Sequence, residues 1–233
     1  WHSSCIKKFF GTAQLPDVRL SQNDIESLAE KSAAAGITAT GVQKKLSLHL
    51  YSDSKKNRSS RLTLVGFPAG YILKPATSEY TCLPESEHLV MSMADAAGIE
   101  TVPHALIHLA DNSIAYITKR IDRTATLSAE KTHRIAMEDF CQLSERLTED
   151  KYKGSYEQCA KIIKKYSSQP GLDLSSFFYL IAFCFITGNS DMHLKNFSLI
   201  RFDTWKLSAA YDLLPVNIVN PSDTEETVCR AYQ

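Results

Sequence analysis

The sequence has no excess of either charge sign and no long apolar run. Among its 233 residues, 26 Lys and Arg balance 26 Asp and Glu, so the formal net charge is zero. A protein without net positive charge has no bulk electrostatic attraction to nucleic acid or to an anionic membrane. The longest apolar run, Phe177 to Ile186, is about half as long as a bilayer-spanning helix. We therefore expect a cytoplasmic globular protein that binds neither a membrane nor nucleic acid directly.

Cysteine pairs and a Walker-type phosphate loop are also absent from the sequence. The six cysteines are scattered without any C-x-x-C pair, and Cys141 and Cys184 lie inside apolar helical patterns. Such thiols are typical of reduced core side chains, not of disulfides or zinc ligands. No G-x-x-x-x-G-K-[ST] pattern occurs, which disfavours a Walker-type NTPase.

The first half has the residue periods of a small antiparallel sheet with flanking helices. Leu46, Leu48 and Leu50 alternate with other residues, which predicts a strand with one buried face. Ser21 followed by Asp24 resembles a capping box at the start of a helix. The predicted strands are residues 44–51, 61–65, 70–75 and 113–121, and the predicted helices are residues 25–35 and 85–97, ended by Gly36 and Gly98.

Helical spacing predominates after about residue 122. The predicted helices are residues 137–147, 156–166 and 175–186, with Gly171 and Gly188 marking helix ends. Two short apolar strands, 197–202 and 205–211, are joined by the polar pair Asp203-Thr204 and predict a hairpin. Together the two halves predict an α+β, two-lobed protein-kinase-like fold, with a small antiparallel β-sheet lobe and a helical lobe.

Chemically capable polar side chains surround this predicted hairpin. Asp191 and Asn196 lie in the loop before it, and Asp212 lies at its exit. Phosphoryl transfer needs a carboxylate near the acceptor hydroxyl and oxygen ligands that hold Mg²⁺ against the nucleotide phosphates. The order therefore predicts Asp191 as the base, and Asn196 and Asp212 as metal ligands. In the first half, Lys74 at a strand end can reach the phosphates, and Glu87 on the next helix can pair with it.

Each of these residues also has an ordinary structural interpretation. Asp191 and Asn196 could be turn and capping residues, and Lys74 could be a solvated lysine. His193 fits a hydrogen-bonded core imidazole as well as a role near the phosphates. The order of the residues favours a phosphoryl-transfer site over these structural interpretations. A protein kinase is the favoured hypothesis, and a small-molecule phosphotransferase of the aminoglycoside or choline kinase type stays an alternative. A catalytically inactive binding module is the third hypothesis, and the presence of Asp191, Asn196, Asp212 and Lys74 argues against it.

Segments spread from residue 41 to residue 215 carry a resemblance to one family. They are "GVQKKLSL" (41–48), "YILKP" (71–75), "KRIDR" (119–123), "MEDFCQL" (137–143), "GNSDMHLKNFSL" (188–199) and "AAYDLLP" (209–215). These segments resemble the nucleotide loop, phosphate-lysine strand, hinge, post-hinge helix, and catalytic and metal segments of the HipA-like serine/threonine kinases of bacterial toxin–antitoxin systems. The resemblance implies ATP-dependent protein phosphorylation, with an aminoacyl-tRNA synthetase as the substrate class and inhibition of translation as the result.

The resemblance also implies lobes, cofactors and a role for individual residues. The implied lobes are residues 1–118 and 124–233, joined by a hinge at 119–123, and the cofactors are ATP and Mg²⁺. Lys119 and Ile121 would meet adenine through their backbones, and Asp122 would meet the ribose. The implied site residues are Asp191, His193 and Asn196 for catalysis; Gly41, Val42, Gln43, Lys74, Glu87, Lys119, Ile121 and Asp122 for ATP; Asn196 and Asp212 for Mg²⁺; and Thr38 and Thr40 for autophosphorylation.

The sequence differs from longer family members at both ends. Its nucleotide loop starts at Gly41, without the further amino-terminal subdomain of those members, and in this it resembles the shorter toxins named HipT. Such toxins work with a separate small protein, HipS, and a DNA-binding antitoxin, HipB, so the resemblance implies HipS-like and HipB-like partners. The chain ends soon after Asp212, where the family continues into more helices, and we expect a reduced or incomplete helical lobe.

Overall fold

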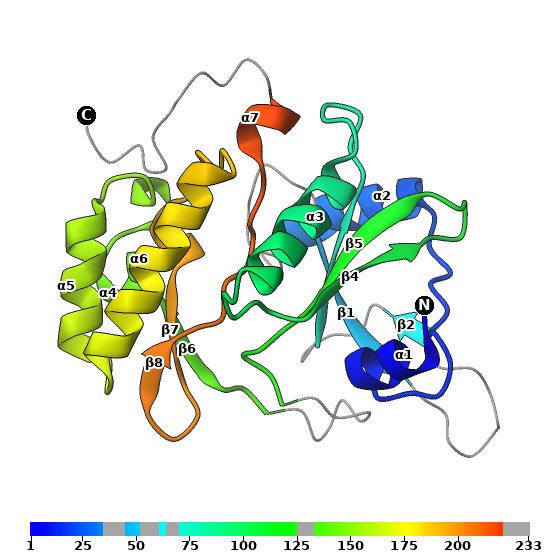
Figure 1. Ribbon diagram of the computed structural model, residues 1–233. Helices are drawn as coiled ribbons and strands as arrows, with labels where there is room; N and C mark the ends of the chain where they lie inside the picture. Colours follow the sequence, from blue (N-terminus) through cyan, green and yellow to red (C-terminus); the bar gives the residue numbers. More distant parts are fainter. Residues whose placement is uncertain (35–44, 52–60, 64–69, 125–132, 221–233) are drawn as a thin grey trace. The chain divides into compact units, whose positions relative to one another are not determined.

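The structure is a computed structural model that describes residues 1–34, 45–51, 61–63, 70–124 and 133–220 (Figure 1). The chain divides into two compact units. The first unit comprises Trp1–His88 and Pro103–Arg134, and the second comprises Leu89–Val102 and Ile135–Gln233. The predicted lobe boundary at residues 119–123 stays a prediction.

The first unit is built on a five-stranded antiparallel sheet with the strand order β2-β1-β3-β5-β4. Its elements are α1 (Ser3–Phe10), α2 (Gln22–Ala34), β1 (Leu46–Tyr51), β2 (Arg61–Thr63), β3 (Tyr71–Pro75), β4 (His104–His108), β5 (Ile114–Lys119) and the beginning of α3 (Leu83–Ala96). The predicted capping box is present at α2, where the Ser21 amide donates to Asp24 Oδ2 at 2.9 Å and the Asp24 amide donates to Ser21 Oγ at 3.2 Å.

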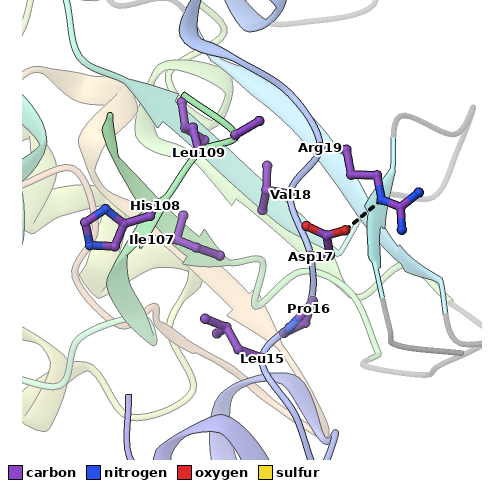
Figure 2. Close-up of a pocket in the computed structure, with 9 residues that line it drawn as sticks. Leu15, Pro16, Asp17, Val18, Arg19, Ile107, His108 and Leu109 are labelled. Carbon is purple, nitrogen blue, oxygen red and sulfur yellow. Dashed lines mark hydrogen bonds and ion pairs between the residues drawn. The ribbon is translucent and has the colours of Figure 1, made fainter. Parts of the chain in front are cut away.

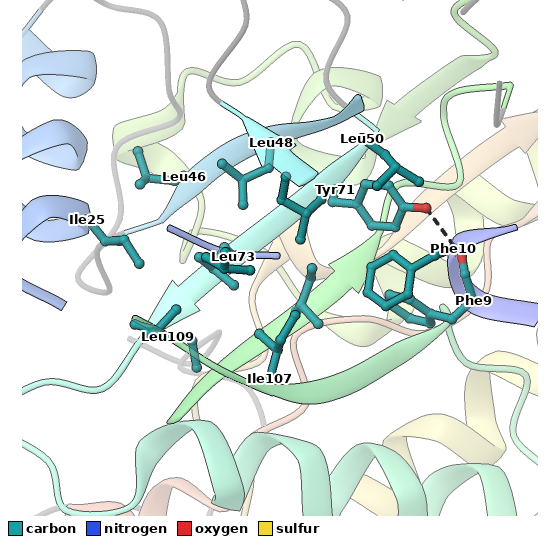
Figure 3. Close-up of a cluster of buried hydrophobic side chains, with 14 of the residues drawn as sticks. Phe9, Phe10, Ile25, Leu46, Leu48, Leu50, Tyr71, Leu73, Ile107 and Leu109 are labelled. Atoms are coloured by element: carbon teal, nitrogen blue, oxygen red, sulfur yellow. Dashed lines mark hydrogen bonds between the residues drawn. The ribbon is translucent and has the colours of Figure 1, made fainter. Parts of the chain in front are cut away.

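The core of the first unit lies on one face of this sheet (Figure 3). Leu46, Leu48 and Leu50 are 1%, 0% and 3% exposed, which confirms the predicted alternation along β1. The cluster comprises Ile6, Phe9, Phe10, Val18, Ile25, Leu46, Leu48, Leu50, Leu62, Tyr71, Leu73, Ile107, Leu109, Ala115 and Ile117. Because successive side chains of a strand point to opposite faces, Lys74 of β3 lies on the face away from this cluster.

The second unit combines helices with a three-stranded antiparallel sheet in the order β6-β7-β8. Its elements are β6 (Ala136–Asp139), α4 (Phe140–Leu143), η2 (Thr148–Asp150), α5 (Tyr156–Tyr166), α6 (Pro170–Ile186), η3 (Leu194–Asn196), β7 (Ser198–Arg201), β8 (Trp205–Leu207) and α7 (Val216–Val219). Helix α6 lies alongside α5 (Figure 1). The rings of Phe140, Phe177 and Phe197 meet pairwise with centroids 5.0 to 6.2 Å apart and form the aromatic part of this core. The predicted helix at 156–166 and the predicted hairpin are confirmed.

The helix predicted at residues 137–147 was wrong at both ends. Residues 137–139 belong to strand β6 and pair with β7, and α4 is only four residues long. The capping chemistry explains where the helix begins. Asp139 Oδ1 accepts the Gln142 amide at 2.8 Å, and the Gln142 side chain accepts the Asp139 amide at 2.9 Å, so the helix can begin only after Asp139.

Three smaller predictions also need correction. Gly171 is not a helix end, because it lies in the first turn of α6, which Pro170 begins. The turn of the β7–β8 hairpin contains Phe202 in addition to Asp203 and Thr204. Strand β4 was not predicted, because among its five residues only Ile107 is buried and no alternation is visible.

Two general expectations concern membranes and thiols. Among the described residues, none of the helices is long and apolar enough to cross a membrane. Cys141 and Cys184 are buried free thiols, as their position in apolar patterns predicted. Burial raises the pKa of Cys184 to about 12, which keeps this thiol protonated and unreactive.

A buried carboxylate joins α6 to the β7–β8 hairpin. Asp173 in the first turn of α6 is 3% exposed. Its carboxylate accepts hydrogen bonds from Ser167 Oγ at 2.6 Å, Gln169 Nε2 at 3.0 Å and the Leu207 amide of β8 at 2.8 Å. The loop before α6 and the strand that leads to Asp212 are therefore held by one side chain.

We expect Asp173→Ala to lower the free energy of unfolding by about 3 kcal/mol, because the partly buried Leu207 amide and Ser167 hydroxyl lose a charged, buried acceptor. The matched control is Asp203→Ala, which removes an exposed carboxylate from the hairpin turn and should change stability by less than about 0.5 kcal/mol. Urea unfolding followed by circular dichroism measures both. Equal effects of the two substitutions would show that Asp173 does not anchor the hairpin.

Candidate functional site

A buried ion pair lies on the sheet face opposite the core of the first unit. Lys74 Nζ donates to Glu87 Oε1 at 2.7 Å, and the two side chains are 8% and 2% exposed. Lys74 comes from β3 and Glu87 from α3, so the predicted pairing of these two residues is present. A lysine that was merely solvated at a strand end would not be buried in this way.

The ion pair lies beside the ring of Tyr116, on which His104 stacks. The Lys74 ammonium lies 5.6 Å from the ring centroid of Tyr116, which is completely buried. His104 stacks on Tyr116, and its Nδ1 lies 3.0 Å from Nδ1 of His88, the residue after Glu87. Burial lowers the pKa of His88 and so favours a neutral imidazole. The ammonium of Lys74 therefore lies over the ring of Tyr116 and forms an ion pair with Glu87.

The backbone of Lys119 and Ile121 lies at the end of β5, where the sheet hydrogen bonds stop. The Lys119 amide donates to the Pro103 carbonyl at 2.9 Å, and the Arg120 amide donates to the Gly70 carbonyl at 2.9 Å. Proline has no amide hydrogen, so Pro103 returns no hydrogen bond to the Lys119 carbonyl. In the described part of the chain, the Ile121 amide also has no acceptor. One acceptor and one donor, two residues apart, are thus available at the end of β5.

Two guanidinium groups hold the side chain of Asp122. Arg120 donates to Oδ1 at 2.9 Å and to Oδ2 at 2.7 Å, and Arg123 donates to Oδ2 and, at 2.8 Å, to the Asp122 carbonyl. Burial by itself would raise the pKa of Asp122, but the hydrogen bonds and the charges of the arginines outweigh it and lower the pKa. Asp122 is therefore an oriented, ionised acceptor next to the Ile121 amide.

The loop between α6 and β7 carries the other predicted site residues. Helix α6 ends before Gly188, which has a φ of +67°, and the short helix η3 leads directly into β7. Within the loop the His193 amide donates to Asn196 Oδ1 at 3.1 Å, and the Asn196 amide donates to the His193 carbonyl at 2.9 Å. Asn196 is 6% exposed, whereas Asp191 is exposed. The loop thus fixes an amide oxygen inside and presents a carboxylate outside.

His193 interacts with all three of the predicted polar side chains, those of Asp191, Asn196 and Asp212. It bonds to Asn196 through its backbone, and the negative charges of Asp191 and Asp212 both act on its imidazole. Burial and, to a lesser degree, the charge of Lys151 lower the pKa of His193, while the two carboxylates oppose this shift. The ring is 9% exposed, and its Nδ1 has no hydrogen-bond partner among the described residues, so it is not a fully satisfied core histidine.

Asp212 lies beyond the hairpin in a strained backbone conformation. Its φ is +61°, in the left-handed region that few residues other than glycine adopt, and its side chain is exposed. The preceding residue fixes this position. Tyr211 Oη donates to the Lys195 carbonyl at 2.9 Å and lies 2.6 Å from Ser198 Oγ. The chain segment of Asp212 is therefore tied directly to the loop that carries Asp191 and Asn196.

The sequence analysis missed the side chains that hold this loop in place. Lys195 Nζ donates to Asp139 Oδ2 at 2.8 Å, so Lys195 is an anchor and Asp139 serves both it and α4. Tyr152 Oη donates to Asp191 Oδ1 at 2.8 Å. The signal for Tyr152 could not come from spacing, because 39 residues separate it from Asp191.

The oxygen donors near His193 fit a hard divalent cation. Asn196 Oδ1 keeps a second lone pair beside the one that accepts the His193 amide, and Asp212 supplies a carboxylate. In the described residues, no three His, Cys, Asp or Glu side chains come together as a metal cluster. Magnesium commonly takes only one or two protein ligands and completes its shell with water and phosphate oxygens. Asn196 and Asp212 are the residues that would hold Mg²⁺ in this way.

Five predicted site residues lie outside the described part of the chain. They are the nucleotide-loop residues Gly41, Val42 and Gln43 and the threonines Thr38 and Thr40. Their predicted roles stay predictions, as does the helix end at Gly36.

A pocket of about 550 Å³ in the first unit contains none of the predicted site residues (Figure 2). It is lined by Leu15, Pro16, Asp17, Val18, Arg19, Ile107, His108, Leu109 and Ala110. Its charged residues Asp17 and Arg19 pair with each other at 2.6 Å, and most of the other lining residues are apolar. This pocket offers no chemistry comparable with that of the site residues.

We expect Glu87→Leu to lower the free energy of unfolding by about 3–5 kcal/mol, because it removes the carboxylate that forms a buried ion pair with the Lys74 ammonium. The double variant Lys74→Met/Glu87→Leu should recover most of this loss, since two apolar side chains replace the pair. Thermal and urea unfolding measure both, with Glu85→Leu on the first turn of the same helix as the control. A double variant as unstable as the single one would contradict this account of the pair.

Comparisons with known proteins identify relatives across most of the chain. The putative kinase Y4dM of Sinorhizobium fredii is 30% identical over 207 residues, which cover 82% of this chain and 48% of that protein. The putative kinase Y4mE of the same organism is 30% identical over 158 residues, 66% of this chain and 37% of the relative. A putative kinase of Haemophilus influenzae is 26% identical over 192 residues, 78% of this chain and 53% of the relative. The chain thus spans 37% to 53% of the length of these relatives.

A solved structure shows the same fold. One chain of the Shewanella oneidensis MR-1 toxin–antitoxin complex of HipA, HipB and its operator DNA superposes with a TM-score of 0.60. It is 21% identical and covers 77% of this chain and 44% of its own length. This similarity confirms the predicted HipA-like α+β fold. The sequence model of the HipA-like C-terminal domain matches residues 37–231. On this match, and on the residues that carry it, the chain belongs to the HipA-like C-terminal domain family.

Proposed function

We propose that this protein is a kinase that transfers the γ-phosphoryl group of ATP to a serine or threonine hydroxyl of another protein. The observation that carries the proposal is that one loop holds Asp191 and Asn196 and is hydrogen-bonded to Tyr211, the residue before Asp212. We propose Asp191 as the base, and Asn196 and Asp212 as the oxygen ligands for Mg²⁺. The buried pair of Lys74 and Glu87 supports it, as do relatives that are themselves named putative kinases.

The first unit supplies the groups for binding ATP. Lys74 contacts the phosphates, and Glu87 fixes the direction of its ammonium. The Lys119 carbonyl accepts from the adenine amino group, and the Ile121 amide donates to a ring nitrogen. Asp122 accepts from a ribose hydroxyl through Oδ1, which takes one hydrogen bond from Arg120 and retains acceptor capacity.

The second unit supplies the groups for transfer. The acceptor hydroxyl gives its proton to Asp191 while its oxygen bonds to the γ-phosphorus, and the bond from that phosphorus to the bridging oxygen breaks to release ADP. Asn196 and Asp212 hold Mg²⁺, which when bound neutralises charge on the phosphate oxygens. His193 belongs to the same loop, and its neutral imidazole adds no positive charge that would compete with the metal.

The substrate and partners follow from the family resemblance. We propose an aminoacyl-tRNA synthetase as the phosphorylated protein, so that the protein acts as a toxin by inhibiting translation. The HipA, HipB and operator DNA complex of Shewanella oneidensis suggests a HipB-like DNA-binding partner, and a HipS-like small protein would complete the assembly.

The direct test of the function is phosphoryl transfer from labelled ATP into proteins of a bacterial lysate. We expect Asp191→Asn and Asp212→Asn each to reduce transfer at least about 100-fold, because one removes the base and the other a charged metal ligand. Asp191→Asn should keep Mg-ATP binding, measured by calorimetry, whereas Asp212→Asn should weaken the Mg²⁺-dependent part of it.

The control is Asp203→Asn, an exposed carboxylate on the hairpin turn of the same unit. It should leave both transfer and binding unchanged. Full activity of either site variant would contradict the assignment of Asp191 and Asp212. If the label enters only small molecules, the protein is a small-molecule phosphotransferase and not a protein kinase.

We further propose that the protein phosphorylates itself at Thr38 or Thr40. A phosphate adds about −1.5 to −2 charge units next to the loop that receives the phosphates of ATP, and the like charges repel. Thr38→Asp and Thr40→Asp should therefore weaken ATP binding, and alanine at the same positions should not.

Mass spectrometry after incubation with Mg-ATP locates the phosphate, and the Asp191→Asn variant is the control for self-modification. The proposal fails if active protein stays unmodified at both threonines, or if the aspartate variants bind ATP as tightly as the wild type.

A further inference from the structure

The segment that precedes α5 meets the loop of Asp191 at three places, through two hydrogen bonds and one close approach. The Lys151 carbonyl accepts the Leu194 amide at 3.1 Å. Tyr152 Oη donates to Asp191 Oδ1 at 2.8 Å. A Cβ atom placed on Gly154 would lie 2.8 Å from the side chain of Leu194, so a larger residue would require Leu194 to shift. The position of Tyr152 relative to the loop is therefore fixed by its neighbours on both sides.

The ring of Tyr152 is oriented by its own contacts. It meets the His193 ring edge to face, with centroids 5.1 Å apart and an interplanar angle of 74°. The Lys151 ammonium lies 4.7 Å from its centroid, over the ring face. Edge-to-face and cation–π contacts both favour this rotamer of the Tyr152 side chain, and with it this position of its hydroxyl. The hydroxyl is consequently aimed at Asp191 by packing, without depending on the hydrogen bond alone.

Asp191 needs such a restraint because its side chain is exposed. A carboxylate on the surface rotates among rotamers, and proton abstraction requires one oxygen to lie within hydrogen-bond reach of the acceptor hydroxyl. A hydrogen bond from a fixed hydroxyl to a carboxylate is charge-assisted and selects one orientation. Oδ1 already accepts the Tyr152 hydroxyl, whereas Oδ2 accepts no hydrogen bond from the described residues and is the better placed oxygen for the substrate.

We propose that Tyr152 is the positioning residue of this site, which holds Asp191 through Oδ1 so that Oδ2 receives the proton of the acceptor hydroxyl. This inference rests on the proposed kinase function. It adds a residue to the transfer machinery that acts through Asp191 and does not contact ATP. A tyrosine that only supported the fold would contribute to stability independently of Asp191.

The test compares four forms of the 233-residue protein: wild type, Tyr152→Phe, Asp191→Ala and the double variant. The initial rate of label transfer from ATP into lysate protein is measured over a range of ATP concentrations. Tyr152→Phe keeps the ring contacts with His193 and Lys151, and it should lower the maximal rate about tenfold, the value of a charge-assisted hydrogen bond. The ATP concentration at half-maximal rate and the melting temperature should stay unchanged.

The double variant separates positioning from structure. If Tyr152 acts through Asp191, Tyr152→Phe should cause no further loss in the Asp191→Ala background. The matched control is Tyr179→Phe, which removes a hydroxyl that donates to the Ala97 carbonyl at 3.3 Å in the same unit. It should leave the rate at the wild-type value.

Three results would overturn the inference while the kinase function stands: full activity of Tyr152→Phe, an equal fold-loss from Tyr152→Phe with and without Asp191, or label found on Tyr152 itself, which would make it the acceptor. A wild type that transfers no label is a different result, because it overturns the proposed function and this inference with it.

Discussion

A lysine and a glutamate buried together, with 8% and 2% of their side chains exposed, are the constraint on which the first unit depends. Removing two charges from water is costly, and apolar side chains of similar volume often stabilise a fold as well as a buried ion pair or better. Stability alone therefore does not explain Lys74 and Glu87. The ring of Tyr116, on which His104 stacks, and the carboxylate of Glu87 restrict the position of the ammonium, so that it is oriented before any anionic ligand arrives.

In the second unit, neutral hydrogen-bonding groups hold the loop that carries the exposed carboxylate of Asp191. The loop between α6 and β7 joins two elements that contain buried residues. The buried backbone groups of this loop must therefore form hydrogen bonds within the loop or with neighbouring segments. Asn196, the Lys151 carbonyl and Tyr211 meet this requirement. Asp191 is left exposed, with one oxygen held by Tyr152. Rigid support under a reactive side chain is what pre-organised catalysis requires.

Local chemistry determined which features could be predicted from the sequence. The alternation of Leu46, Leu48 and Leu50 and the capping box at Ser21 are local signals, and both are present in the structure. The hairpin that lies between Asp191 and Asp212 in the sequence was also predicted, and it is present as β7 and β8. Strand β6 was mistaken for helix because a helix follows it at once, and β4 has too few buried residues to show a period. The contact of Tyr152 with Asp191 joins residues far apart in sequence, so no spacing could reveal it.

Under the proposed function, Asn196 and Asp212 hold Mg²⁺ with ATP, while Lys74 contacts the phosphates. A crystal structure of the protein with Mg²⁺ and a non-hydrolysable ATP analogue tests it most directly. The account predicts a metal ion about 2.1 Å from Asn196 Oδ1 and from an Asp212 carboxylate oxygen. It also predicts adenine against the Lys119 carbonyl and the Ile121 amide. A nucleotide bound elsewhere, or a metal ion that contacts neither Asn196 nor Asp212, would contradict the account.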